Sequence, residues 1–118
     1  MVLFLEYPKC STCIKAKKWL DEHGVQYEDR HIKENRPNEE ELKAWIEKSS
    51  LLIKRFFNTS GMVYKSLELK ERLPEMTDEE KIKILATDGM LVKRPLIIGD
   101  GGVLVGFKPA EWEACPWL

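Results

Sequence analysis

Residues 7–13 read Tyr7-Pro8-Lys9-Cys10-Ser11-Thr12-Cys13, and they join a short apolar run, Val2 to Leu5, to a segment with helical spacing, Ser11 to about His23. Two thiols therefore stand where a strand is expected to end and a helix to begin. At a helix start the first backbone N–H groups have no partner within the helix, and the helix dipole adds partial positive charge. Such a position stabilises a thiolate, the nucleophilic form of cysteine. The stretch predicts a redox or thiolate-transfer site.

The spacing of the two cysteines suits disulfide exchange. With Cys10 at or near the N-cap and Cys13 in the first turn, the second thiol can reach the first and resolve a mixed disulfide without a large movement. The alternatives are two packed free cysteines or half of a zinc site. Zinc would need two more ligands, and His23, His31 and Cys115 form no second ligand pair. We expect a redox pair without a metal, and Cys115 as an incidental free cysteine or an alternative resolving thiol.

The composition predicts a single globular domain. The chain has 118 residues, of which 43% are hydrophobic and 33% charged, and its formal net charge is -1. This balance gives no bulk electrostatic reason to bind nucleic acid or an anionic membrane. No apolar run approaches the roughly 20 residues of a membrane span, and the sequence begins with an expected strand rather than a signal peptide. We expect a cytoplasmic protein.

A strand–helix–strand unit is expected around the cysteines. Apolar residues repeat at helical spacing as far as Leu20, Gly24 supplies a stop, and a second strand is expected from Val25 to Ile32. Such a unit connects parallel strands by a right-handed crossover.

Helical signals then fill about residues 37–88. Capping boxes are expected at Asn38 and Thr77, and further helical patches from about Ser50 to Phe57 and from Tyr64 to Leu69. These helices form an insertion before the last part of the sheet.

The remaining sequence predicts a β-hairpin. Two apolar runs, Leu96-Ile97-Ile98 and Val103-Leu104-Val105, flank a Gly/Asp turn, and a last short helix is expected from Pro109 to Trp112. The predicted fold is an α/β domain with a small mixed four-stranded sheet and a helical insertion between the βαβ crossover and the C-terminal hairpin.

Three motifs together resemble the arsenate reductase (ArsC)/Spx family, which has a thioredoxin-like fold. They are the cysteine stretch at 7–13, the run Arg94-Pro95-Leu96-Ile97-Ile98 and the run Val105-Gly106-Phe107-Lys108-Pro109. The helical block also fits, so the resemblance covers nearly all of residues 1–118. It implies that Cys10 is the nucleophile, that Arg94 lies beside it and stabilises a thiolate or bound anion, and that Pro95 takes the cis-proline position.

The sequence departs from the glutaredoxin-linked arsenate reductases, which resemble one another in an arginine triad and in lacking a second cysteine three residues on. Here Asn58 and Lys108 stand where two of the arginines are expected, and Cys13 is present. Arsenate favours several bidentate donors, which arginine supplies and lysine does not. Asn58 and Lys108 stay candidate anion contacts, as do Ser11 and Thr12 through their backbone N–H groups.

The leading hypothesis is a thiol–disulfide oxidoreductase without a bound cofactor. The Cys10 thiolate would attack a small disulfide, a glutathione adduct or another oxidised substrate, Cys13 would resolve the product, and glutathione or a thioredoxin- or glutaredoxin-type donor would restore the dithiol. By resemblance to Spx, the alternative is a redox-sensing transcriptional adaptor that contacts the C-terminal domain of the RNA polymerase α-subunit and not DNA. Glutaredoxin-dependent arsenate reduction is the third hypothesis.

Overall fold

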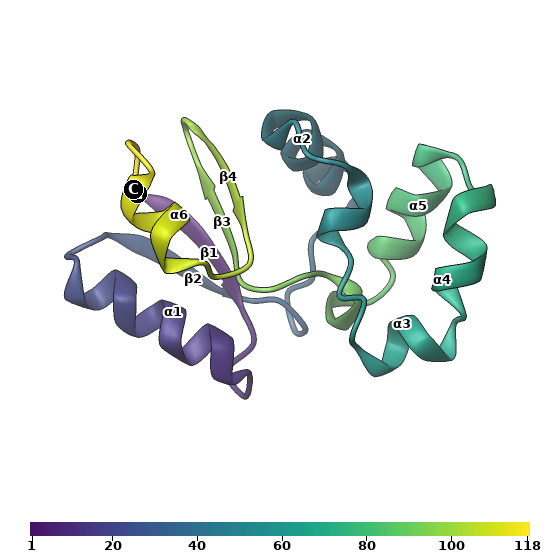
Figure 1. The fold of residues 1–118 in the computed structure, drawn as a ribbon, viewed down its shortest axis with the longest axis horizontal. Coiled ribbons are helices and arrows are strands. Elements are labelled where there is room, and N and C mark those ends of the chain that lie inside the picture. The colour runs from purple at the N-terminus through teal and green to yellow at the C-terminus, as the bar shows by residue number, and fades with distance from the viewer. The chain divides into compact units, whose positions relative to one another are not determined.

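Four strands form one mixed sheet in the computed structural model, which describes residues 1–118 (Figure 1). Strand β1 (Val2–Glu6) runs parallel to β2 (Tyr27–His31) on one side and antiparallel to β3 (Leu96–Gly99) on the other. Strand β4 (Gly102–Val105) pairs antiparallel with β3, so the order is β2-β1-β3-β4. The predicted α/β fold with a mixed four-stranded sheet is confirmed.

The chain forms two compact units by its contacts. Residues 1–31 and 94–118 make the sheet unit, and residues 32–93 make the helical unit. The expected helical insertion at about 37–88 lies within the second of these ranges.

Helix α1 (Ser11–Glu22) connects β1 to β2 as the sequence predicted. Its apolar residues fall on one face, so Cys13, Ala16 and Leu20 are buried. The helix exit passes through Gly24 at φ +67°, a left-handed conformation that glycine adopts without a steric penalty. The Val25 N–H donates to the Leu20 carbonyl (3.0 Å), which explains why β2 begins later than the expected Val25.

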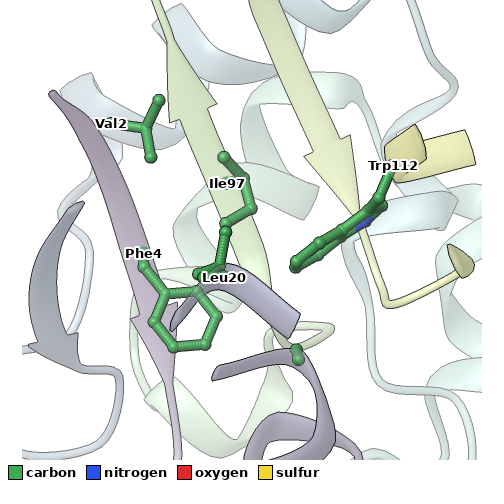
Figure 2. Close-up of a cluster of buried hydrophobic side chains, with 6 residues drawn as sticks. Val2, Phe4, Leu20, Ile97 and Trp112 are labelled. Carbon is green, nitrogen blue, oxygen red and sulfur yellow. The ribbon is translucent and has the colours of Figure 1, made fainter. Parts of the chain in front are cut away.

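One apolar cluster fills the space between the sheet and its helices (Figure 2). Side chains alternate across a strand, so β1 directs every second residue to the face that α1 covers. Helix α6 (Pro109–Ala114) contributes a tryptophan to the same cluster and therefore covers the same face. The buried members are Val2, Phe4, Ala16, Leu20, Ile97 and Trp112.

The β3–β4 turn contacts the indole ring of Trp117. A Cβ atom added to Gly99 or to Gly101 would lie 2.5 Å from ring carbons of Trp117, closer than van der Waals contact allows. Glycine is therefore required at both positions while this ring packs on the turn.

The helical unit contains the two predicted capping boxes. Asn38 caps α2 (Glu39–Ser49) and Thr77 caps α5 (Asp78–Leu85), and in each the side chain of the third helical residue bonds back to the cap. The other elements of this unit are short: η1 (Ile53–Phe56), α3 (Met62–Ser66), α4 (Leu69–Arg72), η2 (Leu73–Glu75) and η3 (Gly89–Leu91). None of the helices in the chain is long and apolar enough to cross a membrane.

Two predicted helical patches were wrong in extent. The patch expected from Ser50 is reduced to a 3-10 helix, because Ser50 adopts a left-handed φ of 58° that ends α2. The patch expected from Tyr64 to Leu69 is divided, because Glu68 also takes a left-handed φ, of 54°, between α3 and α4. Neither position is glycine, so no local signal in the sequence marks these breaks.

Candidate functional site

Cys10 is the N-cap of α1, as the sequence predicted. Its backbone is extended (φ −88°, ψ 121°), and its Sγ accepts a hydrogen bond from the Cys13 N–H at 3.4 Å. The Cys10 N–H donates to the Tyr7 carbonyl at 2.9 Å, which closes the turn between β1 and α1. Both cysteines are free thiols, and Cys10 is partly exposed while Cys13 is 1% exposed.

The surroundings of Cys10 favour its thiolate. Burial opposes ionisation more than any single contact favours it, yet the contacts together lower the pKa of Cys10 below its ordinary value. They are hydrogen bonds from the N–H and thiol of Cys13, a hydrogen bond from the Thr12 N–H, and the positive charge of Arg94. The first-turn amides therefore act as the sequence predicted for a helix start.

Cys13 has the opposite character. Burial first, and then the hydrogen bond and charge of Cys10, raise its pKa to about 12, against a backbone hydrogen bond from Tyr7 and the charge of Arg94. The site thus pairs a partly exposed thiol whose pKa is lowered with a buried thiol whose pKa is raised. This is the asymmetry that distinguishes an attacking from a resolving cysteine.

Arg94 lies close enough to both thiols for its charge to lower their pKa values. It precedes Pro95, which is buried and joined to it by a cis peptide bond. The guanidinium Cζ stands 5.4 Å from the centre of the Tyr7 ring, and its Nε and Nη1 atoms are buried without a hydrogen-bond partner. Donors so placed can pair with an anion, whether a thiolate or a bound group.

Ser11 and Thr12 occupy the first two positions of α1 and are exposed. The Thr12 N–H is among the groups that stabilise the Cys10 thiolate. Their use as anion contacts, like that of Pro95, stays a prediction.

Lys108 and Asn58 have other partners in the structure. Lys108 caps α6, and its Nζ lies 3.6 Å from the Glu111 carboxylate. Asn58 belongs to the helical unit, where its N–H donates to the Leu91 carbonyl at 2.7 Å and its side chain accepts from Ser60 Oγ at 3.3 Å. Their roles as anion contacts stay predictions.

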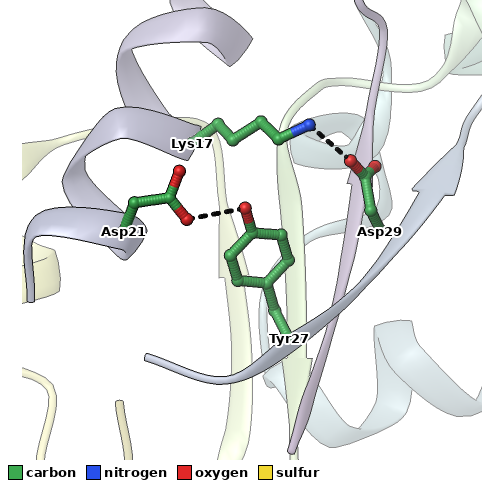
Figure 3. Close-up of polar contacts among 4 residues, drawn as sticks. All are labelled: Lys17, Asp21, Tyr27 and Asp29. Carbon is green, nitrogen blue, oxygen red and sulfur yellow. Dashed lines mark hydrogen bonds and ion pairs between the residues drawn. The ribbon is translucent and has the colours of Figure 1, made fainter. Parts of the chain in front are cut away.

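The sequence reasoning missed a groove of about 830 Å³ next to the cysteine turn. Two polar pairs connect α1 with β2 along it: Lys17 Nζ lies 2.7 Å from Asp29 Oδ2, and the Tyr27 hydroxyl donates to Asp21 Oδ1 at 2.8 Å (Figure 3). The lining residues come from β1, α1, β2 and the turn between them: Glu6, Pro8, Ile14, Lys17, Lys18, Asp21, Glu22, Asp29 and His31.

Glu6 is the buried carboxyl of this groove. It is 5% exposed, and burial raises its pKa to about 7, with a hydrogen bond to Asp29 and the charge of Asp29 acting in the same direction. A charged residue at the end of an apolar strand was the available sequence signal. Glu6 therefore holds a proton at pH values where an exposed glutamate is ionised.

Glu6 should make the folded state less stable as pH rises from about 4.5 to about 7. In that window the folded chain binds the proton that the unfolded chain has lost, so the free energy of unfolding falls with increasing pH. Glu6→Gln removes this titration. As pH rises from 5 to 8, we expect the free energy of unfolding of the variant to increase by about 1–3 kcal/mol relative to that of wild type. Urea denaturation at both pH values measures the difference. The exposed Glu28→Gln is the matched control, and a Glu6→Gln curve parallel to wild type would contradict the assignment.

The sheet order, the crossover helix and the paired thiols at its start define a thioredoxin-like α/β protein with a Cys-x-x-Cys site. Comparison with known proteins gives the family: the chain matches the ArsC family over residues 5–115 and belongs to it.

Relatives of this chain include both an uncharacterized protein and a regulator. The uncharacterized protein YusI of Bacillus subtilis (strain 168) is 56% identical over 110 residues, which cover 93% of either chain. Regulatory protein MgsR of the same organism is 31% identical over 108 residues, 92% of this chain and 84% of its own. The crystal structure of an ArsC family related protein from Bacteroides fragilis is 60% identical, with a TM-score of 0.93 over 96% of this chain and 95% of that one.

Proposed function

We propose that this protein is a thiol–disulfide oxidoreductase in which Cys10 attacks the substrate and Cys13 resolves the product. The observation that supports this most directly is the contrast between the two thiols. The pKa of Cys10 is lowered at the N-cap of α1, whereas burial raises that of Cys13 to about 12. A redox cycle needs this order of reactivity, because the first step consumes a thiolate and the second follows only once Cys10 is oxidised.

The proposed cycle balances as follows for a substrate R–S–S–R′. The Cys10 thiolate attacks one sulfur, the S–S bond breaks, and R′–S⁻ leaves and takes a proton from solvent. Cys13 then loses its proton and attacks Cys10 Sγ, which releases R–S⁻ as the second thiol and forms the Cys10–Cys13 disulfide. The substrate has gained two electrons and the protein has lost two.

The dithiol must then be restored by an external reductant. In this proposal the donor is glutathione, two molecules of which become one glutathione disulfide, or a thioredoxin- or glutaredoxin-type dithiol protein. Such donors keep thiols reduced in the cytoplasm, where we propose the protein acts.

A coupled assay tests the proposal. NADPH oxidation is followed with a glutathione mixed disulfide as substrate, in one arm with glutathione and glutathione reductase and in the other with thioredoxin and thioredoxin reductase. We expect turnover in at least one arm, and we expect Cys13→Ser protein to accumulate a glutathione adduct on Cys10 that intact-protein and peptide mass spectrometry detect. A wild-type protein that forms its disulfide but turns over in neither arm would overturn the enzymatic proposal.

The match to regulatory protein MgsR favours a second candidate function. Here the Cys10–Cys13 disulfide acts as a switch in a transcriptional adaptor, and the partner is the C-terminal domain of the RNA polymerase α-subunit. Pull-down of that purified domain by the reduced protein, by the diamide-oxidised protein and by Cys13→Ala protein tests this. Binding that changes with oxidation in wild type alone would support the switch, and absence of binding in every state would exclude it.

A further inference from the structure

Tyr7 contacts Cys10, Cys13 and Arg94 of the thiol site. Its carbonyl accepts the Cys10 N–H at 2.9 Å, and its backbone acts on Cys13 by a hydrogen bond that lowers the pKa of that thiol. Its ring, half-buried, lies under the guanidinium of Arg94 with 5.4 Å from Cζ to the ring centre. The backbone of Tyr7 thus holds the cysteines, while its ring contacts the nearby cation.

We propose that the Tyr7 ring is a positioning element that holds the Arg94 guanidinium at the Cys10 thiolate. The inference rests on the proposed function in one respect, because it adds a positioning residue to the same Cys10 site. Its test measures the ionisation of Cys10 and not turnover.

The ring matters because hydrogen bonds do not fix two of the guanidinium nitrogens. Nε and Nη1 of Arg94 are buried and have no hydrogen-bond partner in the chain. An arginine side chain has several rotatable bonds, so where these two nitrogens form no hydrogen bond, the aromatic ring against the guanidinium helps to orient it. Stacking on Tyr7 leaves the N–H groups at the guanidinium edge available to a thiolate or a bound anion.

The Tyr7 ring is itself held from the sheet side. The ring of His31 meets it edge to face, with centres 5.7 Å apart and planes at 87°. His31 stands opposite Glu6 in the parallel β1–β2 pairing, so the sheet fixes its backbone position. A continuous series of contacts therefore leads from β2 through His31 and Tyr7 to Arg94.

Ring and backbone contributions can be separated by substitution. Tyr7→Leu keeps the backbone hydrogen bonds to the cysteines and removes the aromatic platform. Tyr7→Phe keeps the platform and removes only the hydroxyl. If the ring acts through Arg94, its removal should matter only while Arg94 is present.

The experiment measures the pH dependence of Cys10 alkylation by iodoacetamide in the full chain, with peptide mass spectrometry to separate Cys10 from Cys13 and Cys115. We expect Tyr7→Leu and Arg94→Gln each to raise the apparent pKa of Cys10, Tyr7→Leu by about half a unit to one unit. The double variant should show no further rise beyond Arg94→Gln, and Tyr7→Phe should restore the wild-type profile.

Several results would overturn the proposal. A Tyr7→Leu profile equal to wild type, or a double variant whose shift is the sum of the single shifts, would show that the ring does not act through Arg94. Circular dichroism confirms that each variant is folded, and Tyr7→Met replaces Tyr7→Leu if the latter is not. Because alkylation needs no substrate turnover, failure of the proposed enzymatic function would leave this test unaffected.

Discussion

Cys10→Ser protein should lose disulfide-reducing turnover by a factor on the order of 10³ or more, the scale seen when a catalytic nucleophile is removed. The reason is ionisation, since a serine hydroxyl keeps its proton at neutral pH and lacks the nucleophilicity of a thiolate. The coupled NADPH assay described above measures the loss.

The fold should survive this substitution, which makes the result interpretable. Cys10 is the N-cap of α1, and its Sγ accepts the Cys13 N–H. Serine is among the preferred N-cap residues because its oxygen accepts that same bond. Unchanged circular dichroism together with lost turnover would therefore assign the loss to chemistry.

Cys115→Ser is the matched control for Cys10→Ser. Cys115 is a free thiol at the C-terminal end of α6, so its substitution tests thiol loss away from the α1 N-terminus. We expect it to keep wild-type turnover. Full turnover by Cys10→Ser would move the nucleophile away from Cys10. Loss of turnover in Cys115→Ser would instead give Cys115 a part in the cycle, as the alternative resolving thiol.

The sheet and the cysteine pair could be predicted because their signals are local. Helical spacing places Cys13 on the buried face of α1, and the position of Cys10 before the first helical residue makes it the cap. The hairpin was predicted from two apolar runs around a Gly/Asp turn. Both capping boxes were predicted from an N-cap residue and a glutamate three positions later. Each of these features depends on neighbours in the sequence.

The place of Arg94 beside Cys10 came only from the family resemblance, and the contacts around it could not be predicted, because they join residues that only the fold brings together. Tyr7 and Arg94 lie at opposite ends of the chain and meet because β1 and β3 pair in the sheet. The raised pKa of Glu6 likewise depends on Asp29 in the neighbouring strand. The left-handed backbone at Ser50 could not be predicted either, because the residue there is not glycine.

Trp112→Ala should cost about 3–5 kcal/mol of the free energy of unfolding, the range for removing a buried aromatic side chain. Trp112 is 1% exposed and joins α6 to the cluster beneath β1 and β3. Its ring packs edge to face against Trp19 and Phe107, with centres 5.4 Å and 4.7 Å away. Globular domains have only about 5–15 kcal/mol in total, so this loss is a large part of the stability.

The Trp112 indole also satisfies a buried carbonyl. Its Nε1 donates to the Gly106 carbonyl at 3.2 Å. Trp112→Phe keeps most of the packing but leaves that carbonyl unpaired, so we expect an intermediate cost of about 1–3 kcal/mol. Urea denaturation followed by circular dichroism gives both values, and Glu113→Ala on the exposed side of α6 should stay within about 0.5 kcal/mol of wild type.

Trp112→Ala should also change the reactivity of the thiol site. Cys13 and Trp112 are each 1% exposed, and Cys13 lies on the buried face of α1, whose Ala16 and Leu20 pack in one cluster with Trp112. We expect Cys13 to be protected from alkylation while that face stays packed. If Trp112→Ala lowers the stability of the sheet unit, the locally open state becomes more populated. The alkylation rate of Cys13 should then rise by the same factor as the population of that open state. Faster labelling of Cys13, with little change in the rate at the already accessible Cys10, would show that packing of the core protects the resolving thiol from external reagents. Equal Cys13 labelling rates in wild type and Trp112→Ala would contradict that link.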